Sequence, residues 1–176
     1  HFNIEKDIKV IPNFIDFSRF KKTNKEHFRK AIAPNGEKIL VHTSNFRKVK
    51  RIDDVVKVFS KIQQIIPSKL LLIGDGPERQ HIEILARNIC KIDDVRFLGR
   101  QDAVEEILAI SDLFLMPSES ESFGLAALEA MACEVPVISS DAGGIPEVNI
   151  TGKTGFVLPV GDVDGMVEKC LYLLQN

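Results

Sequence analysis

The stretch "KILVHTSNFRKVKRIDDVVKVFSKI", residues 38–62, contains two different hydrophobic periodicities. Its first seven residues contain a short apolar run, Ile39 to Val41, which is typical of a strand buried on both faces of a parallel sheet. After a basic turn, apolar residues return with helical spacing, at Ile52, Val55, Val56, Phe59 and Ile62. This spacing places one apolar stripe along a helix. The stretch therefore predicts a strand followed by a helix that packs against the sheet.

The same alternation continues along the chain. Five further runs of strand length follow: "KLLLIG" (69–74), "VRFLG" (95–99), "DLFLMP" (112–117), "VPVISS" (135–140) and "GFVLP" (155–159). Helical patterns lie between and after them, near 77–90, 102–110, 124–132 and 162–174. Alternating strands and helices predict an α/β fold, a Rossmann-like doubly wound parallel sheet of about six strands.

Residues 1–35 do not follow this alternation. The stretch "VIPNFIDFSRF" contains a Pro–Asn turn, and "NKEHFRKAIAPNG" is typical of a short helix closed by Pro34 and Gly36. We predict an interdomain linker and entry helix over 1–35 and a Rossmann-like domain over 36–176. Because the chain starts with His1 and ends inside a helical pattern, we expect it to be a piece of a longer protein.

Composition excludes several classes of function. The net charge of −2 gives no reason to expect nucleic acid or a membrane surface as the main partner. No apolar run approaches the ~20 residues of a membrane span. The three cysteines, Cys90, Cys133 and Cys170, fit neither a disulfide framework nor a zinc pattern, so we expect a reducing, cytoplasmic setting.

The unusual residues of the chain follow its predicted strands. The segments after the first five strands are "NFRKVKR", "GDGPER", "GRQD", "SESESFG" and "DAGGIPE". Ligands of open parallel sheets bind beyond the carboxyl ends of the strands. The basic cluster, the glycines and the carboxylates are therefore expected to meet at one edge of the sheet.

The segment "ESFGLAALE" predicts a phosphate site at the start of a helix. Ser122, Phe123, Gly124 and Leu125 surround that start, where free N–H groups and the helix dipole attract anions. Gly124 would let a ligand approach the backbone closely. From Ser122 to Cys133, the only charged residue is Glu129, in a helix that otherwise looks built for burial.

Glu121 and Glu129 flank this predicted phosphate site. Carboxylates accept hydrogen bonds from hydroxyl groups, so the two suit sugar or ribose hydroxyls. The alternative is that Glu121 only complements the helix dipole and Glu129 faces water. The uncharged surroundings of Glu129 favour a functional role for that residue, whereas both interpretations of Glu121 stay open.

The basic run "RKVKR", residues 47–51, has four cations in five positions. At the same sheet edge, Arg47 could fork across two oxygens of a diphosphate and Lys50 could act as a mobile point charge. The alternatives are a solvated entrance to the next helix or a nucleic-acid patch. The second is weaker, because the chain as a whole is not basic and has a net charge of −2.

Other motifs have ordinary explanations. "GDGPER" lacks the third glycine of a dinucleotide fingerprint, which argues against a dehydrogenase. In "DVD", Asp162 is expected to cap a helix with Asp164 in its first turn, so we predict no metal site. His42, next to a strand end, is expected to pack rather than react.

The stretch "ESFGLAALEAMACEVPVISSDAGGIPEV…TGKTGFVLPVGD" resembles the donor-binding, C-terminal half of the retaining glycosyltransferases of family 4, which have the GT-B fold of two Rossmann-like domains. Their signature is two glutamates separated by seven residues, here Glu121 and Glu129. "VIPN", starting at residue 10, resembles the family's interdomain linker. The resemblance covers nearly all of the chain and implies a missing N-terminal acceptor domain.

The resemblance also implies roles for individual residues. Glu121 would bind hydroxyls of the transferred sugar, and Glu129 the ribose of a nucleotide sugar. The amides around Phe123, Gly124 and Leu125 would hold the diphosphate while Arg47 and Lys50 neutralise it as it leaves. Leu98 to Gln101, with Arg100, would border the base. Such enzymes retain the anomeric configuration through a front-face reaction and need no metal or other cofactor.

Two positions depart from the family pattern. Many members have Gly–Arg after the first strand, where this chain has Ser44–Asn45, so the diphosphate arginine would have to be Arg47. Glu134 replaces a glycine that usually follows the helix. If its backbone is left-handed, the glutamate costs on the order of 1 kcal/mol.

Within the family, "SNFRKVKRIDDVV" and "VGDVDGM" most resemble the subfamily that transfers N-acetylglucosamine from its uridine diphosphate to L-malate in bacillithiol biosynthesis. The alternatives are a transferase with another nucleotide sugar and acceptor, such as a mannosyl or glucosyl transferase of polysaccharide synthesis, and a non-catalytic nucleotide-binding module. A redox domain holding a nicotinamide or flavin is a further alternative. On its own, the fragment is expected to bind UDP weakly and to transfer no sugar.

Overall fold

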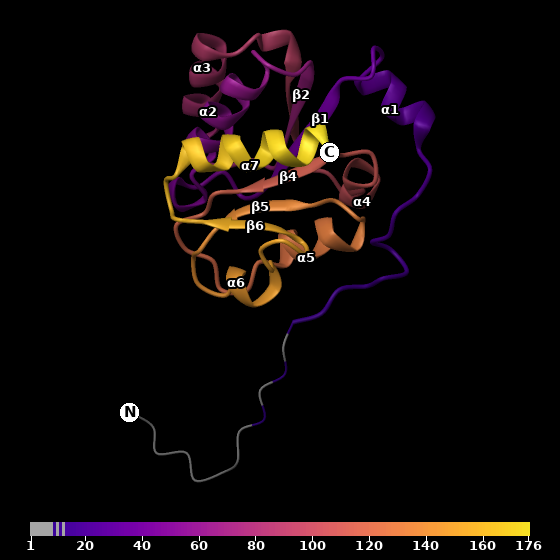
Figure 1. Cartoon of the computed structure of the whole chain (residues 1–176), viewed down its shortest axis with the longest axis vertical. Coiled ribbons are helices and arrows are strands. Elements are labelled where there is room, and N and C mark those ends of the chain that lie inside the picture. Colours follow the sequence, from indigo (N-terminus) through magenta and orange to yellow (C-terminus); the bar gives the residue numbers. More distant parts are fainter. Residues whose placement is uncertain (1–8, 10, 12) are drawn as a thin grey trace.

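The structure is a computed structural model that describes residues 9, 11 and 13–176. In this part of the chain, six strands form one parallel sheet, flanked by helices (Figure 1). The strands are β1 (Lys38–Thr43), β2 (Ser68–Ile73), β3 (Val95–Gly99), β4 (Leu113–Met116), β5 (Val137–Ser140) and β6 (Gly155–Leu158). The α-helices are α1 (Glu26–Ile32), α2 (Ile52–Ile62), α3 (Arg79–Ile89), α4 (Val104–Leu108), α5 (Leu125–Ala132), α6 (Ile145–Val148) and α7 (Val163–Gln175). Two short 3₁₀ turns, η1 (Lys48–Lys50) and η2 (Ile92–Asp94), complete the list.

The predicted Rossmann-like sheet is confirmed. The strand order is β3-β2-β1-β4-β5-β6, so the order reverses between β1 and β4. These two strands pair in register at Leu40 with Leu113 and at Val41 with Phe114. A reversal of this kind leaves a crevice at the carboxyl ends of the two central strands.

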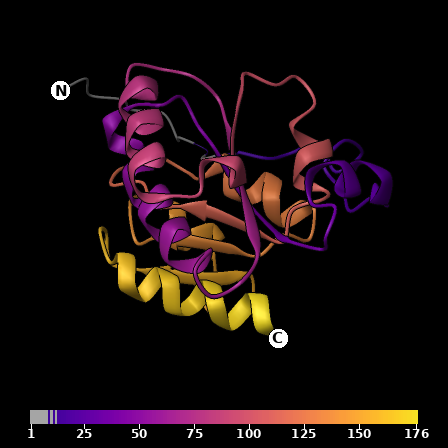
Figure 2. The ribbon, with the colours of Figure 1, turned by 90° about the horizontal axis from the view of Figure 1, so that it is seen from above.

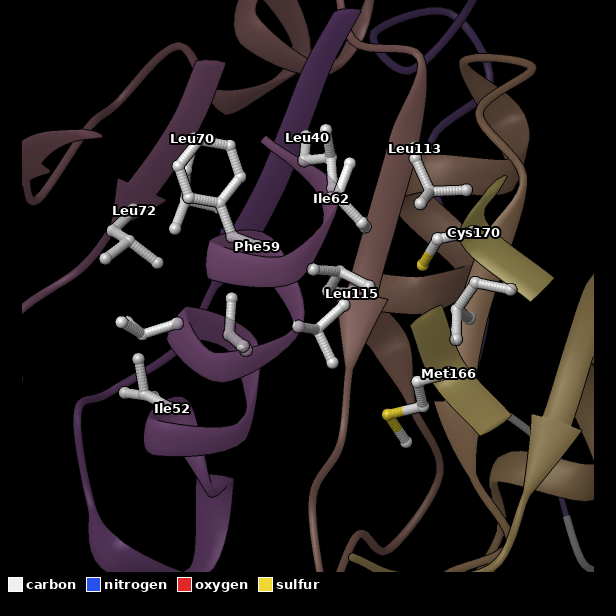
Figure 3. Packing of buried hydrophobic residues seen from close by; sticks show 14 of the residues in the cluster. Leu40, Ile52, Phe59, Ile62, Leu70, Leu72, Leu113, Leu115, Met166 and Cys170 are labelled. Carbon is white, nitrogen blue, oxygen red and sulfur yellow. The ribbon is translucent and has the colours of Figure 1, made fainter. Parts of the chain in front are cut away.

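Each face of the sheet has its own core. Leu40 points to the face that α2, α3 and α7 cover, where it packs with Phe59 and Leu70 (Figure 3). Ile39 and Val41 point to the opposite face, toward α4, α5 and α6. Phe59 is completely buried, and burying a side chain of this size stabilises the fold by roughly 1.5–3 kcal/mol. Seen from above, α7 forms one outer edge of the fold (Figure 2).

The segment before the sheet contains the expected short helix, α1. Phe20, Ile32 and Ala33 are buried in the second core, so this part of the segment packs on the domain. Arg29 reinforces the contact through an ion pair with Asp112 at 2.7 Å. The "VIPN" stretch lies partly outside the described residues, and the role of 1–35 as an interdomain linker stays a prediction.

The helix ends follow local chemistry. Asp162 caps α7 as expected, because its Oδ1 accepts a hydrogen bond from the Gly165 amide at 2.9 Å. α5 starts at Leu125, within one residue of the helix predicted near 124–132, because Gly124 has a left-handed φ of 91° that ends the preceding loop.

The C-terminus of α5 is closed by Glu134, which has a left-handed φ of 59°. The Glu134 amide donates to the Met131 carbonyl and the Val135 amide to that of Ala130, the two bonds of a Schellman motif. The conformation that would make glutamate unfavourable at this position is therefore present.

Candidate functional site

A cavity of about 320 Å³ lies at the carboxyl ends of β1 and β4, where the strand order reverses. Three segments line it: the end of β1 with the loop that follows, the loop after β4, and the first turns of α5. Of the residues expected to form a site, Lys50, Glu121, Leu125 and Glu129 are in this lining. The convergence expected at one sheet edge is thus present for these four.

Phe46 anchors the loop between β1 and Lys50. Its side chain is completely buried, its amide donates to the Asp75 carbonyl at 3.1 Å, and its carbonyl accepts from the Glu78 amide at 2.9 Å. A Cβ on Gly76 would lie 2.7 Å from the Phe46 carbonyl oxygen. The glycine-rich loop after β2 therefore allows two loops to pack closely. This agrees with the prediction that "GDGPER" is not a dinucleotide fingerprint.

Lys50 and Glu121 form an ion pair inside the cavity. The Glu119 amide donates to the Val49 carbonyl at 2.9 Å and so ties the loop after β4 to the 3₁₀ turn η1. This contact brings Lys50 Nζ within 2.5 Å of Glu121 Oε2, with the two side chains 19% and 15% exposed. Partial burial makes such a pair stronger than a surface ion pair and makes the loss of one partner costly.

The backbone of Glu121 is positioned by the loop after β5. Gly143 has a left-handed φ of 56°, and a Cβ on it would lie 1.8 Å from the Glu121 carbonyl oxygen. The Gly144 amide donates to that oxygen at 3.0 Å, and a Cβ on Gly144 would lie 2.5 Å from the Ser122 oxygen. Only residues without a side chain allow the two loops to approach so closely.

Glu129 reaches the cavity from α5, whose other side packs into the core through Ala127 and Ala130. Its side chain is half-buried, and burial raises the pKa of its carboxyl group; the nearby Arg19 opposes this rise and Glu105 adds to it. Among the described residues, Glu129 forms no salt bridge. The carboxylate in the otherwise uncharged helix therefore faces a polar cavity rather than the core.

The start of α5 offers free hydrogen-bond donors. No side chain of the described residues caps this helix, in contrast to α7, which Asp162 caps. Gly124 is buried, Phe123 is half-buried, Ser122 is exposed, and Leu125 lines the cavity. A helix start that lacks a side-chain cap suits an anionic ligand, because its first N–H groups have no intrahelical acceptor.

The other six residues that were expected to bind a ligand do not line this cavity: Ser122, Phe123 and Gly124, which directly precede Leu125, and Arg47, Leu98 and Arg100. Arg47 is exposed at the start of η1, three residues before Lys50. Leu98 is partly buried against the second core, and Arg100 is exposed after β3. Their ligand roles stay predictions.

The cavity also contains polar residues that the sequence did not single out as ligands. His42 is 1% exposed and packs against Phe114 with the ring centroids 6.4 Å apart, as expected of a packing histidine. It also lines the cavity together with Ser44 and Ser118. Ser118 lies in the "SESES" segment, and its place two residues beyond β4 was the available signal. Hydroxyl residues are common in loops, so this signal was too weak to use.

A second cavity, of about 390 Å³, lies beside the N-terminal ends of α2 and α3. Its charged groups neutralise one another: Arg51 and Lys57 both pair with Asp54, and His81 lies 3.1 Å from Asp53. Within the described residues, no group of three or more His, Cys, Asp or Glu could hold a metal ion. We therefore consider the smaller cavity at the strand reversal as the candidate site.

The model of the family "Glycosyl transferases group 1" matches residues 23–176, and the chain belongs to this family. It is 50% identical to the N-acetyl-alpha-D-glucosaminyl L-malate synthase of Bacillus anthracis over 97% of this chain and 45% of that protein.

Two solved structures have the same fold. HepE of Anabaena in complex with UDP-glucose superposes with a TM-score of 0.87 at 22% identity, over 95% of this chain and 48% of that one. S. aureus TarM, in complex with Fondaparinux, alpha-GlcNAc-glycerol and UDP, gives a TM-score of 0.76 at 26% identity, over 80% of this chain and 29% of that one. The chain thus spans about half or less of the length of these proteins.

Among the described residues, no helix combines the length and the apolar character needed to cross a membrane.

Proposed function

We propose that this chain is the donor-binding, C-terminal half of a retaining glycosyltransferase that transfers N-acetylglucosamine from UDP-N-acetylglucosamine to L-malate. The observation that carries the proposal is the cavity at the strand reversal, where Lys50, Glu121 and Glu129 meet the uncapped start of α5. The 50% identity to the malate synthase supports the particular donor and acceptor.

The charges of the cavity suggest which part of the donor each residue would bind. Lys50 is a cation in the lining, whereas Glu121 and Glu129 are carboxylates. A diphosphate would therefore lie against Lys50 and the free amides around Phe123, Gly124 and Leu125, with Arg47 adding charge from its exposed loop. The carboxylates suit hydroxyl groups: Glu121 those of the transferred sugar and Glu129 those of the ribose. Residues 98–101 would border the base.

The chemistry we propose uses no metal and no protein nucleophile. Positive charge that is already in place stabilises the diphosphate as negative charge develops on it, and the leaving diphosphate helps to deprotonate the acceptor on the same face of the sugar. Lys50 is suited to this role because its ion pair with Glu121 fixes its ammonium group before the donor binds.

Acceptor binding requires residues that this chain does not supply. The chain spans 45% of the malate synthase, and we propose that a domain preceding residues 1–35 binds the acceptor and that 1–35 is the linker to it. A cytoplasmic setting is part of the proposal and is consistent with the free thiols of Cys90, Cys133 and Cys170.

Calorimetric titration of the chain tests the proposal with UDP, UDP-N-acetylglucosamine, GDP-mannose and NAD. We expect binding of the two uridine ligands and no sugar transfer by the chain alone. Preference for GDP-mannose would replace the donor but keep the class of enzyme. Binding of NAD alone would contradict the proposal.

Transfer itself is tested with the full-length enzyme that contains this chain, supplied with UDP-N-acetylglucosamine and L-malate. Formation of the malate glycoside with retained configuration is expected. A full-length enzyme that binds the donor but transfers to no acceptor would favour a non-catalytic module.

A further inference from the structure

We propose that Ser44 is a specificity residue that accepts a hydrogen bond from a hydroxyl or amide group on the sugar part of the donor and that is unsuited to its diphosphate, because His42 takes the hydrogen of the Ser44 hydroxyl. This inference rests on the proposed function, since it concerns the same cavity.

The contacts of His42 determine which of its ring nitrogens carries the hydrogen. Its Nδ1 lies 2.8 Å from the Leu115 carbonyl oxygen, and a carbonyl only accepts, so Nδ1 carries the hydrogen. Its Nε2 lies 2.8 Å from Ser44 Oγ. Burial lowers the pKa of His42 to about 4, so the ring is neutral near pH 7 and Nε2 has a lone pair rather than a hydrogen. The Ser44 hydroxyl must therefore donate to Nε2.

The backbone of Ser44 is held in a fixed position. Its amide donates to the Ile73 carbonyl at 3.1 Å. Its own carbonyl oxygen lies against Gly74, where a Cβ would approach it to 1.8 Å. With its backbone held and its hydrogen engaged, Ser44 presents only oxygen lone pairs to a ligand in the cavity. Lone pairs accept from O–H or N–H groups and repel the oxygens of a phosphate.

Ser118 supplies an independent observation that a polar ligand group belongs in this cavity. It lines the cavity and is 1% exposed, yet its Oγ is without a hydrogen-bond partner in the part of the chain that the structure describes. Leaving a buried hydroxyl without a partner is unfavourable, because the group loses its hydrogen bonds to water and gains none in the protein. A sugar hydroxyl or amide can both donate and accept, so such a group would satisfy Ser118 once the Ser118 side chain turns its enclosed Oγ toward the cavity.

These contacts divide the cavity chemically. Lys50 and the start of α5 offer the donors that phosphate oxygens require, whereas Ser44 offers an acceptor. The ribose and the transferred sugar carry the same type of hydroxyl group. The experiment is designed to tell which of the two faces Ser44.

The test is calorimetric titration of the chain and its Ser44→Ala and Ser44→Thr variants with UDP-N-acetylglucosamine, UDP and inorganic pyrophosphate. We expect Ser44→Ala to weaken binding of UDP-N-acetylglucosamine about 3- to 10-fold, to leave pyrophosphate unchanged, and to be rescued by Ser44→Thr. An equal loss for UDP places the ribose against Ser44, and a loss limited to the nucleotide sugar places the transferred sugar there.

Two results would overturn the inference: no effect of Ser44→Ala on either uridine ligand, or a loss for pyrophosphate as large as that for UDP-N-acetylglucosamine. Both results leave the proposed function intact if the parent chain binds uridine ligands. A parent chain that binds neither ligand would instead refute the proposed function, and this inference with it.

His42 is tested as a positioning residue. In a folded His42→Asn variant, the amide can still donate to Leu115, but the Ser44 hydrogen is released. We expect pyrophosphate binding to strengthen about 2- to 5-fold, because Ser44 can now donate to it, and the gain to vanish in the His42→Asn, Ser44→Ala double variant. A purely structural role would give no gain that depends on Ser44, and that result would contradict our assignment.

Discussion

Glu121 and Glu129 face one cavity, but they are held in different ways. Glu121 lies in a loop. Its carboxylate pairs with Lys50 at 2.5 Å, and its backbone packs against the glycines of the loop after β5. Glu129 lies on α5 and has a raised pKa because it is partly buried. The loop carboxylate is thus positioned by tertiary contacts, whereas the helix carboxylate is positioned by its own helix and lacks an ion-pair partner among the described residues.

One ligand site can therefore contain a carboxylate whose charge is already paired and another whose charge is not. The charge of Glu121 is already compensated in the free protein, so its geometry is fixed before a ligand arrives. The charge of Glu129 is partly desolvated, so this residue gains most from hydrogen-bond donors that a ligand brings. The four predictions below run from the largest expected effect to the smallest; three test this contrast, and one tests the end of the helix that carries Glu129.

The largest effect is expected at Gly143, against which the backbone of Glu121 packs. Gly143→Ala would place a Cβ 1.8 Å from the Glu121 carbonyl oxygen at a φ of 56°, so the loop or the strand end must move. We expect a loss of about 3 kcal/mol of stability, or roughly 6–12 °C in Tm, measured by thermal unfolding. The control is Gly152→Ala, at a φ of 78° with nothing within 4 Å, where only about 1 kcal/mol should be lost. Equal losses would contradict the role of the contact.

The ion pair itself is tested with Lys50→Met. The change leaves Glu121 unpaired and removes the cation proposed for the diphosphate, so UDP should bind about 10- to 100-fold more weakly in a calorimetric titration. Lys61→Met is the matched control, because Lys61 pairs with Asp164 on an exposed surface. If both variants bound UDP like the parent, Lys50 would have no part in the site.

A smaller effect is expected at the C-terminal end of α5, away from the ligand. Glu134→Gly should stabilise the chain by about 1 kcal/mol, or 2–4 °C in Tm, because glycine adopts the left-handed φ of 59° without strain. Glu134→Ala is the control: it removes the carboxylate but keeps the Cβ, and it should give little gain. A similar gain from both variants would implicate the charge rather than the backbone.

The smallest effect concerns the pKa of Glu129. Because burial raises this pKa above its ordinary value of 4.5, folding favours the protonated form. The stability linked to that proton is present at low pH and is lost as the pH rises through the raised pKa. Glu129→Gln should therefore raise Tm at pH 7.5, by an amount equivalent to about 0.5 kcal/mol once solvent screening is allowed for, and should have no effect near pH 4.

Glu121→Gln is the comparison variant for this pH series. It breaks the ion pair with Lys50 and should lower Tm at pH 7.5 instead of raising it. Gains from both substitutions, or from neither, would show that the two carboxylates do not differ as described.

Much of the fold was predictable from short patterns. The run at 38–44 and the stripe from Ile52 to Ile62 predicted β1 and α2, because strand and helix periodicities are local properties of the chain. The cap at Asp162 followed in the same way. The helix predicted near 124–132 agrees with α5 to within one residue, and the left-handed backbone of Gly124 fixes its start.

The candidate site was only partly predictable. Glu129 could be singled out, since a lone carboxylate in an apolar helix is visible in the sequence. Ser44 and Ser118 could not, because a serine in a loop has no distinctive pattern until its neighbours are known. The hydrogen bond from Ser44 to His42 and the unpartnered hydroxyl of Ser118 are observable only in three dimensions.

The sequence by itself determined the alternation of strands and helices, the glycine-rich loops and the family to which the chain belongs, because these depend on local periodicity and on residue identity. The tertiary structure decided which loops meet. Lys50 contacts Glu121, which lies 71 positions further along the chain, and Gly143 packs against the backbone of Glu121. Contacts of this kind depend on the order of strands in the sheet. That order follows from the packing of two cores on opposite faces and is not written in any single segment.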